Sequence, residues 1–451
     1  MTEIKDIQKL FFIGIGGIGM SALARYFKSL GKYVAGYDKT PSALTAELQK
    51  EGITVIFETA VERIPAEIAE DPKALVVYTP AIPKNLPLTS FFREHGFVME
   101  KRSEVLGRIT KNIFTLAVAG THGKTTTTAM LSHLLFQCGA EVTAFIGGIS
   151  EDYNSNLILA GNKVVVVEAD EYDRSFLRLS PNIAAITSMD SDHLDIYGGE
   201  KEMQDSFRDF AALLPKDGTL YYRNGLPLKG ISAGIEDNNA DISAQNIEIR
   251  EGSYHFDLKT PKGIITGFSL RLPGKHNLLN AVIALAMALE YGISSEKLKA
   301  ALAGFSGVRR RFTYRINTPD LVLIDDYAHH PAEIDAAYQA VREMHPGREV
   351  LVVFQPHLYS RTRDFAAEFA RSLGKFDQVI LLDIYPAREE PIEGIDSRWL
   401  LEQVKNGKKK LVTKEMLPGE VLNSGAKVVI MLGAGDIGEE VEKVRKALSG
   451  E

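Results

Sequence analysis

The chain has 451 residues, of which 45% are hydrophobic and 25% are charged, and its formal net charge at pH 7 is -7. At about 150 residues per domain, this length predicts about three domains, and the composition is that of a globular protein. The net negative charge argues against a general nucleic-acid binder, which needs a basic face to neutralise phosphates.

Cys138 is the only cysteine, which excludes an internal disulfide and a cysteine zinc site and indicates a reducing compartment. No apolar run approaches the ~20 residues of a membrane span. The first apolar stretch is broken by glycines and lacks the small-residue cleavage site of a signal peptide. We therefore expect a cytoplasmic protein that does not insert into membranes.

The first hundred residues alternate β-rich apolar runs with helical or polar segments, a pattern that predicts a parallel α/β sheet. The predicted strands are 11–16, 33–38, 54–57 and 74–82. Residues 14–19 (GIGGIG) follow the first strand and match G-x-G-x-x-G, and Asp38 ends the next strand about 20 residues on, as in a dinucleotide fold. Such a loop offers backbone N–H groups to a diphosphate but does not identify the nucleotide.

A second α/β unit begins near Arg108, with a predicted strand over 113–120 and a helix over 125–138. Between them lies Gly120-Thr121-His122-Gly123-Lys124-Thr125. The loop lacks the first glycine of the standard phosphate-binding pattern, because Val118 stands there, but it keeps the glycines, the lysine and the hydroxyl that phosphate and magnesium need.

Acidic residues gather at the ends of the next two predicted strands, 163–171 and 182–190, and directly after them. The carboxyl edge of a parallel sheet is where ligands bind, and carboxylate oxygens suit magnesium. A solvated acidic loop is the alternative for both groups. The first group is Glu168, Asp170, Glu171 and Asp173, and the second is Asp190, Asp192, His193 and Asp195.

Two helices over 276–292 and 296–305 precede a composition change at 307–311, after which a third α/β unit begins. Its predicted elements are 320–327, 332–344, 349–356, 363–373, 378–386 and 426–448. The strands end in polar residues, which indicates one shared edge that faces a site. Residues 433–438 (GAGDIG) repeat the glycine pattern of the first loop, so at least one of the two matches is only a tight turn. The polar ends supply Arg361 and Arg363 as candidate carboxylate or phosphate clamps, and His329, His330 and His357 as candidate proton carriers.

Taken together, these motifs resemble the Mur ligases from end to end. The resemblance rests on ten segments in order: GIGGIGMSALA, AGTHGKTTTT, EADEYDRSF, MDSDHLDIYG, LPGKHNLLNA, GVRRRF, DDYAHHPAE, FQPHLYSRTRDF, DIYPAREEPIEG and GAGDI. It implies an α/β protein of three domains. These are an N-terminal Rossmann-like UDP-binding domain (1–107), a central P-loop ATPase domain (108–314) and a C-terminal Rossmann-like domain that binds an amino acid (315–451).

The resemblance also implies roles for single residues. The diphosphate of the sugar nucleotide would lie against Gly16, Gly17, Ile18 and Gly19, and its ribose and uracil near Asp38, Thr79, Pro80 and Ala81. ATP would be held by Gly120, Thr121, His122, Gly123, Lys124, Thr125, Thr126, Asn280 and Arg309. Thr125 and Glu168 would hold one Mg²⁺ and His193 would help to hold a second, while Tyr327, His329 and Arg361 would surround the amino acid. The catalytic residues would be Lys124, His193, His329 and Arg361.

The implied reaction is an ATP-dependent ligation in peptidoglycan precursor synthesis. ATP would phosphorylate the lactyl carboxylate of UDP-N-acetylmuramate, and the amine of L-alanine would attack the acyl phosphate. His329 is a plausible base for that amine, which must be neutral to attack. Many family members carry arginine where this chain has Leu358, so one polar contact near the alanine is either absent or supplied by Arg363.

Three other readings of the sequence remain. A recycling ligase would attach an intact tripeptide to the same sugar nucleotide. An NAD-dependent oxidoreductase would use the first loop alone, and it leaves Lys124, Thr125 and Glu168 without a role. A P-loop ATPase would move a partner rather than form a bond, and would release phosphate without any sugar nucleotide.

Overall fold

The computed structural model describes residues 4–80, 82–83, 85–190, 199–250, 252–387 and 389–451. The predicted site residues Ala81 and His193 lie outside the described residues. The chain divides into two compact units. Unit 1 comprises Met1–Glu248, His255–Ser269 and Leu279–Ser306, and unit 2 comprises Ile249–Tyr254, Leu270–Leu278 and Gly307–Glu451.

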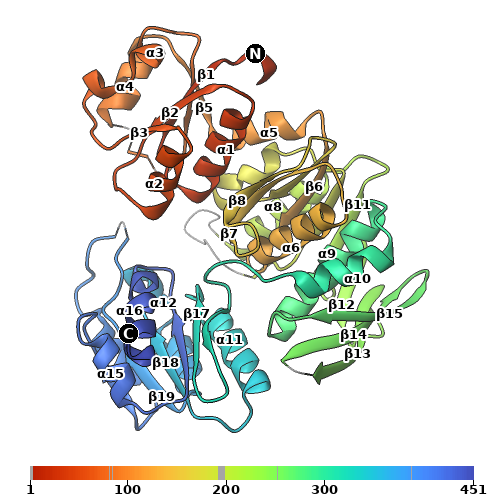
Figure 1. Cartoon of the computed structure of the whole chain (residues 1–451), viewed down its shortest axis with the longest axis vertical. Helices are drawn as coiled ribbons and strands as arrows, with labels where there is room; N and C mark the ends of the chain where they lie inside the picture. Colours follow the sequence, from red (N-terminus) through yellow and green to blue (C-terminus); the bar gives the residue numbers. More distant parts are fainter. Residues whose placement is uncertain (1–3, 81, 84, 191–198, 251, 388) are drawn as a thin grey trace. The chain divides into compact units, whose positions relative to one another are not determined.

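Unit 1 begins with a parallel five-stranded sheet in the order β3-β2-β1-β4-β5 (Figure 1). This confirms the predicted parallel sheet. The order reverses between β1 and β4, and α/β sheets bind ligands at such a switch point. The strands are β1 (Lys9–Ile13), β2 (Tyr33–Tyr37), β3 (Thr54–Ile56), β4 (Leu75–Tyr78) and β5 (Val98–Lys101). The helices are η1 (Ile4–Asp6), α1 (Ile18–Ser29), α2 (Ala43–Lys50), η2 (Val61–Arg63), α3 (Ala66–Ala69), α4 (Pro87–Glu94) and α5 (Arg102–Thr110).

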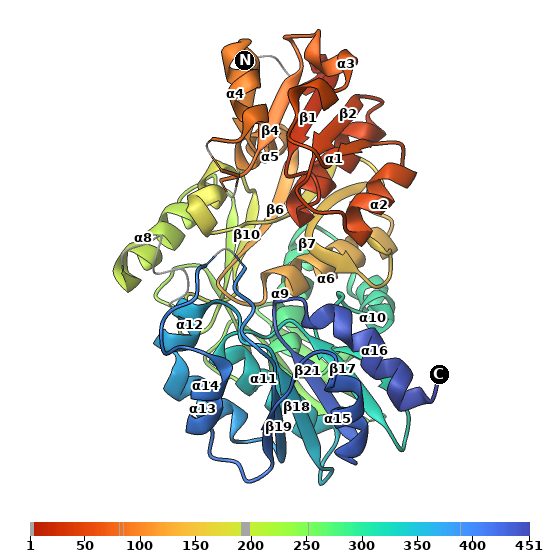
Figure 2. The ribbon, with the colours of Figure 1, turned by 90° about the vertical axis from the view of Figure 1, so that its left-hand side faces the viewer.

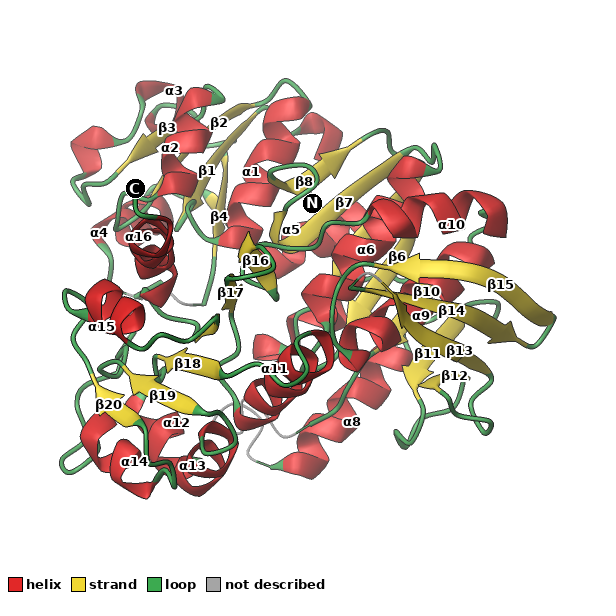
Figure 3. Ribbon diagram, turned by 60° about the horizontal axis from the view of Figure 1, so that its bottom comes forward, coloured by secondary structure: helices red, strands yellow, loops and turns green. Residues whose placement is uncertain are grey.

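The central sheet has ten strands in the order β15-β14-β13-β12-β11-β10-β6-β9-β7-β8. The strands are β6 (Phe114–Ala119), β7 (Val142–Ser150), β8 (Ser155–Leu159), β9 (Val164–Glu168), β10 (Ile183–Ile186), β11 (Thr219–Arg223), β12 (Ile231–Ile235), β13 (Ile242–Arg250), β14 (Ser253–Thr260) and β15 (Gly263–Leu270). The helices are α6 (Lys124–Gln137), η3 (Tyr172–Arg178), α8 (Glu200–Ala211), α9 (Lys275–Glu290) and α10 (Ser295–Gly304). Figure 3 shows β12 to β15 extending this sheet, an addition that our sequence analysis did not predict.

The middle strands of this sheet are buried because their sequences are almost entirely apolar. All four valines of β9 have no exposed surface, and the middle of β6 and β10 is equally covered. Unbroken apolar runs of this kind suit a parallel sheet with both faces covered. Helix α1 of the first sheet contacts β7 and β8, and α5 contacts η3, so the two sheets of unit 1 share one apolar core.

Unit 2 holds a six-stranded sheet in the order β16-β17-β21-β18-β19-β20, in which only β16 is antiparallel to its neighbour (Figure 2). An apolar core lies on each face of the sheet. The strands are β16 (Thr313–Asn317), β17 (Val322–Asp326), β18 (Val350–Phe354), β19 (Gln378–Leu381), β20 (Lys409–Leu411) and β21 (Val428–Leu432). The helices are α11 (Pro331–Met344), α12 (Tyr359–Asp364), α13 (Ala366–Leu373), α14 (Ser397–Gln403), α15 (Leu417–Asn423) and α16 (Ile437–Ser449).

The three sheets match the three α/β parts expected from the sequence. The expected limit at residue 107 falls inside α5, and the one at residue 314 falls inside β16. The domain limits therefore stay predictions. Within the described ranges, no helix is both long enough and apolar enough to cross a membrane.

Substitution of Gly107 tests how closely the two parts of unit 1 pack against each other. A Cβ at this position would lie 2.4 Å from the carbonyl oxygen of Arg178, a backbone atom that cannot swing away. We expect Gly107→Ala to lower the free energy of unfolding of unit 1 by roughly 1–3 kcal/mol, as overpacking does. Urea denaturation followed by circular dichroism measures the change.

Gly419 in α15 is the matched control, because a Cβ there would meet nothing within 4 Å. Alanine in an exposed helical position is favoured over glycine by about 0.5–1 kcal/mol, so Gly419→Ala should raise stability slightly. A Gly107→Ala protein as stable as the wild type would contradict the packing described here.

Candidate functional site: two glycine loops and a histidine cluster

The first glycine loop is a tight turn between β1 and α1. Gly14 has a positive φ of 89°, and the N–H groups of Gly14 and Ile15 donate to the carbonyl of Tyr37 at 2.7 and 2.9 Å. The N–H of Gly16 donates to Oδ2 of Asp38 at 2.7 Å, and a Cβ at Gly16 would lie 2.9 Å from the same oxygen. Asp38, the predicted ribose contact, thus lies against the loop, and this close approach explains why residue 16 is glycine.

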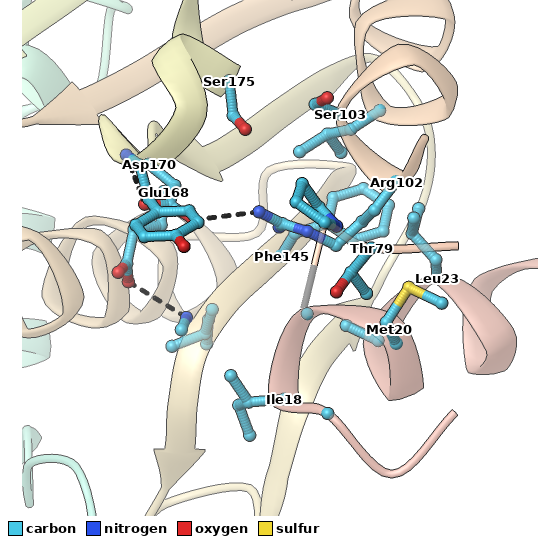
Figure 4. A pocket seen from close by; sticks show the side chains of 18 residues that line it. Ile18, Met20, Leu23, Thr79, Arg102, Ser103, Phe145, Glu168, Asp170 and Ser175 are labelled. Atoms are coloured by element: carbon cyan, nitrogen blue, oxygen red, sulfur yellow. Dashed lines mark hydrogen bonds and ion pairs between the residues drawn. The ribbon is translucent and has the colours of Figure 1, made fainter. Parts of the chain in front are cut away.

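A pocket of about 300 Å³ lies beside this loop within unit 1. The start of α1, the end of β4 and the strands β7 and β9 form its walls. Figure 4 shows Arg102 reaching across it to Asp170, with Nη2 and Oδ2 3.0 Å apart. The predicted residues that line it are Gly17, Ile18, Gly19, Thr79, Pro80 and Glu168. The first loop and the predicted metal ligand therefore face one space.

Arg102 and Phe145 also line the pocket, and our sequence analysis did not select them. Arg102 directly follows β5, so its place at the carboxyl end of a parallel strand was a usable signal. Phe145 lies inside β7 and carries no such signal, because its exposure to the pocket follows from the packing of α1 on β7.

The second glycine loop joins β6 to α6 and is fixed by the end of β10. Gly120 and Gly123 have φ of 136° and 82°, and Gly123 is the N-cap of α6. Oγ of Ser188 accepts from the N–H of His122 at 2.7 Å and pairs with Oγ1 of Thr121 at 2.8 Å. A Cβ on Gly123 would lie 2.6 Å from Oδ1 of Asn280, so the predicted nucleotide residue Asn280 stands against the loop.

Lys124 starts α6, and its ammonium turns back over the loop. Nζ donates to the carbonyl oxygens of Gly120 and Thr121 at 2.5 and 3.2 Å, and pairs with Oε1 of Glu171 at 2.8 Å. Burial opposes the charged ammonium, but the carboxylates of Glu171 and Glu168 outweigh this effect and raise the pKa of Lys124 above its ordinary value. Lys124 is therefore a fixed positive charge beside the loop.

Three carboxylates of the first acidic group form ion pairs with lysine or arginine side chains, so this group is not simply a solvated acidic loop. Asp170 pairs with Arg102, Asp173 with Lys101, and Glu171, only 2% exposed, with Lys124. Glu168 ends β9, and its Oε2 accepts from the N–H of Gly147 at 3.1 Å. Thr125 lies in the first turn of α6, the helix that follows β6, and β6 is the neighbour of β9 in the sheet.

A second cluster of predicted residues lies at one edge of the sheet of unit 2. Nδ1 of His329 is 2.9 Å from the carbonyl oxygen of Tyr327 and 3.3 Å from Oε2 of Glu333. The ring centroids of His329 and His357 are 5.9 Å apart, and Nη1 of Arg361 is 3.4 Å from Nδ1 of His357. The structure thus brings Tyr327, His329 and Arg361 together with His357.

Burial lowers the pKa of His329 below its ordinary value, and the positive charges of Arg361 and Arg311 act in the same direction. Glu333 and the carbonyl of Tyr327 oppose this effect but do not overcome it. The imidazole of His329 is therefore neutral near pH 7 and able to accept a proton.

Arg363 lies apart from this chemistry. Its side chain is 51% exposed and pairs with the neighbouring Asp364 at 2.8 Å. Leu358 is the N-cap of α12 with a φ of 72°, and its N–H donates to the carbonyl of Tyr385 at 2.9 Å. Nothing in these contacts supports Arg363 as the replacement for an arginine at position 358. Arg309 is exposed and stays a predicted nucleotide contact.

The second G-x-G-x-x-G match, at residues 433–438, is a turn occupied by the protein's own side chains. Nη2 and Nη1 of Arg310 donate to the carbonyl oxygens of Gly433 and Gly435 at 2.5 and 3.2 Å. Oε1 of Gln355 accepts from the N–H of Ile437, the first residue of α16, at 2.9 Å. Arg310 and Gln355 therefore lie against this turn, whereas a pocket lies beside the first loop.

Models of three Mur ligase domains match the chain in order. They are described as the catalytic domain of the Mur ligase family (residues 9–113), the Mur ligase middle domain (118–288) and the glutamate ligase domain of Mur ligases (310–435). A curated relative from Christiangramia forsetii, named UDP-N-acetylmuramate–L-alanine ligase, is 60% identical over 449 residues, 99% of each chain. This chain belongs to the Mur ligase family.

Two further matches agree with this assignment. A protein of the same name from Flavobacterium psychrophilum is 56% identical over 446 residues, again 99% of each chain. The crystal structure of the UDP-N-acetylmuramate–alanine ligase of Thermotoga maritima superposes with a TM-score of 0.84 at 27% identity, covering 98% of this chain and 99% of that one. The fold of that Mur ligase therefore extends over 98% of this chain.

Substitution of Gly120 tests whether the second glycine loop binds ATP. A Cβ there would lie 2.2 Å from Oγ1 of Thr187 at a φ of 136°, so alanine must distort the loop. We expect Gly120→Ala to weaken ATP binding on the order of tenfold or more, since loop amides and Lys124 would no longer align. Affinity for a UDP-sugar should stay unchanged. Isothermal titration with each nucleotide measures both.

Gly161, between β8 and β9, is the matched control because it has a nearly equal φ of 135° and an equally crowded Cβ, 2.5 Å from Cβ of Glu141. Gly161→Ala should cost stability but leave ATP affinity intact. Equal loss of ATP binding in both variants would mean that backbone strain in general, rather than the loop, is responsible.

Proposed function

We propose that this chain joins L-alanine to the lactyl carboxylate of UDP-N-acetylmuramate, coupled to the conversion of ATP to ADP and phosphate. Relatives that are 43% to 60% identical over at least 98% of this chain carry the name of that activity. The observation that carries the proposal is the pocket that joins the first glycine loop to Glu168. A nucleotide-linked substrate held by the first glycine loop can extend through this pocket toward Glu168, the proposed magnesium ligand.

ATP occupies the second loop in this proposal. The loop from Gly120 to Gly123, the first turn of α6 and the ammonium of Lys124 would face its phosphates, and Asn280 and Arg309 would contact it further out. Glu171 is the present partner of Lys124. We therefore propose that Glu171 keeps the ammonium over the loop and neutralises it until the phosphates arrive.

Thr125 and Glu168 fit a magnesium ion, because a hydroxyl and a carboxylate oxygen are the ligands that Mg²⁺ takes at a phosphate-binding loop. Bound there, Mg²⁺ would neutralise charge on the phosphates of ATP. His193, proposed as a further ligand, lies outside the described residues.

The amino acid occupies the cluster around His329 in this proposal. The guanidinium of Arg361 would bind the alanine carboxylate, as arginine does in bidentate geometry. Tyr327 would close one side. The neutral imidazole of His329 would take a proton from the alanine ammonium, so that the free amine can attack the acyl phosphate and release phosphate.

Two alternative functions, an NAD-dependent oxidoreductase and a tripeptide ligase, have less support than the alanine ligase. An NAD-dependent oxidoreductase leaves the ordered contacts of Lys124 and Glu171 unexplained, and the family assignment opposes it. A ligase for an intact tripeptide shares the family, but the names of the relatives above favour the alanine enzyme. For the three domains we retain the limits 1–107, 108–314 and 315–451. We also propose a cytoplasmic location, because the single cysteine suits a reducing compartment.

The direct test is phosphate release with ATP, magnesium and UDP-N-acetylmuramate, with L-alanine or the tripeptide in separate reactions. We expect release only with L-alanine, and a product whose mass has increased by one alanine residue. Release with the tripeptide alone would move the chain to the recycling reaction. Release without any sugar nucleotide would favour a P-loop ATPase.

The pH dependence of the rate tests His329. Because its pKa lies below the ordinary value of about 6.5, the base form is fully present at neutral pH and is lost only as the pH falls through that lowered pKa. The kcat/KM of the wild type should therefore fall on the acid side with one such ionisation. His329→Ala should lower kcat on the order of 10²-fold and remove this ionisation from the profile.

His345 serves as the control, since burial also lowers its pKa and it lies in the same unit, 3.3 Å from the hydroxyl of Tyr314. His345→Ala should leave the pH profile unchanged. An intact rate and profile in His329→Ala would remove His329 as the base.

A further inference from the structure

Asn156, on the edge strand β8, is fully buried and hydrogen-bonded to the start of α1 in the neighbouring sheet. Its Nδ2 donates to the carbonyl oxygen of Ile18 at 2.5 Å and to Oγ of Ser21 at 2.9 Å. Ser21 in turn donates to the carbonyl of Ile18 at 3.0 Å. A single side chain of the central sheet thus engages the first turn of the helix that follows the first glycine loop.

The other end of the same amide holds the next part of α1. Oδ1 of Asn156 accepts from Nη1 of Arg25 at 2.5 Å. The remaining donors of this guanidinium, which is 8% exposed, bind Glu51 at 2.7 to 3.0 Å and Glu47 at 3.1 Å. Glu47 of α2 and Glu51, which follows α2, therefore fix the position of Arg25. Both ends of the Asn156 amide thus bind residues of α1.

The position of α1 controls the width of the pocket. Residues of α1 (Ile18, Gly19, Met20, Ala22 and Leu23) and of β7 (Phe145 to Gly147) both line the pocket. β7 pairs with β8, and Phe145 lies opposite Leu157, the residue after Asn156. Because α1 is hydrogen-bonded to both ends of the Asn156 amide, it cannot slide or rotate on β7 without breaking a buried hydrogen bond.

We propose that Asn156 and Arg25, together with Ser21, are positioning residues that fix the distance between the first glycine loop and Glu168. This inference rests on the proposed function, in which the loop holds the nucleotide part of one substrate and Glu168 lies beside the reacting phosphate. We call the three residues the α1–β8 clamp. It touches no substrate and acts through the placement of α1.

The clamp predicts a separation between binding and turnover. In Asn156→Ala, kcat with UDP-N-acetylmuramate should fall on the order of tenfold or more, because misplacement of about 1 Å is enough for a loss of that size. The KM for ATP should stay within about twofold, since the hydrogen bonds of the clamp described above join it to α1, α2 and β8 and not to the second loop. Inhibition by UDP alone should also stay within about twofold, because UDP needs only the N-terminal sheet.

Arg25→Lys and Asn156→Asp refine the test. Lysine keeps a positive charge beside Glu51 but lacks the fork that spans Glu51 and Asn156, so kcat should fall in Arg25→Lys as well. Aspartate still accepts from Arg25 but cannot donate to the carbonyl of Ile18, so Asn156→Asp should lie between the wild type and Asn156→Ala. The double variant Asn156→Ala with Arg25→Lys should be hardly worse than Asn156→Ala alone.

Two controls separate positioning from general stability. Asn182→Ala removes a hydrogen bond of 2.8 Å to the N–H of Thr115, between β6 and the residue before β10 in the middle of the same sheet. It should lower the thermal midpoint without lowering kcat. Glu47→Ala removes only the outermost partner of Arg25 and should change neither. If Asn156→Ala does not fold, Arg25→Lys and Asn156→Asp carry the measurement.

The outcomes are distinguishable from those of the proposed function. A wild type that is inactive with L-alanine would refute the proposed function irrespective of the variants. With an active wild type, clamp variants that lower only the thermal midpoint, like Asn182→Ala, and keep the wild-type kcat well below that midpoint would overturn the clamp. So would a parallel loss of UDP affinity, because the clamp would then shape the loop itself.

Discussion

The pairing of β6 with β9 is the constraint on which the candidate site depends. The two strands run parallel, and Val118 lies opposite Glu168. The residues that follow each strand therefore emerge at one edge, which puts Lys124 within 2.8 Å of Glu171 and leaves Glu168 bonded to Gly147. A shift of this register by one residue would turn Glu168 to the other face of the sheet and separate the charges.

The chain uses the same glycine pattern in two places with different results. After β1 the glycines bring the backbone against Asp38 and leave a pocket of about 300 Å³ beside the helix start. After β21 the equivalent space is taken by Arg310 and Gln355, which bond the loop carbonyls and the first helical amide. The pattern alone therefore predicts a turn, and the side chains packed against it decide whether that turn can receive a phosphate.

Much of this arrangement could be predicted from local sequence. The predicted strands and helices that flank the two functional loops are present. Asp38 and Asn280 lie against the loops, and Tyr327 lies beside His329, while their roles stay predictions. Strand-to-helix turns with glycines have a strong local signature. The bonds of Lys124 to Glu171 and of Asn156 to Ile18 could not be predicted, because they join segments 47 and 138 residues apart.

Local reasoning also fails where residues of the same type differ only in their surroundings. Arg361 and Arg363 occupy almost adjacent positions, yet Arg361 lies near His357 while Arg363 is half exposed and pairs with Asp364. The extension of the central sheet by β12 to β15 was likewise not predicted, since strands 231–270 add to an edge without any loop motif. In both cases the result depends on packing between distant segments.

We propose that the two loops bind two different nucleotides at the same time. The test is to titrate the wild-type protein with ATP, and then with UDP-N-acetylmuramate in the presence of saturating ATP. We expect one site for each nucleotide, no competition between them and no binding of NAD(H). Mutual displacement of the two nucleotides, or saturable binding of NAD(H), would contradict it.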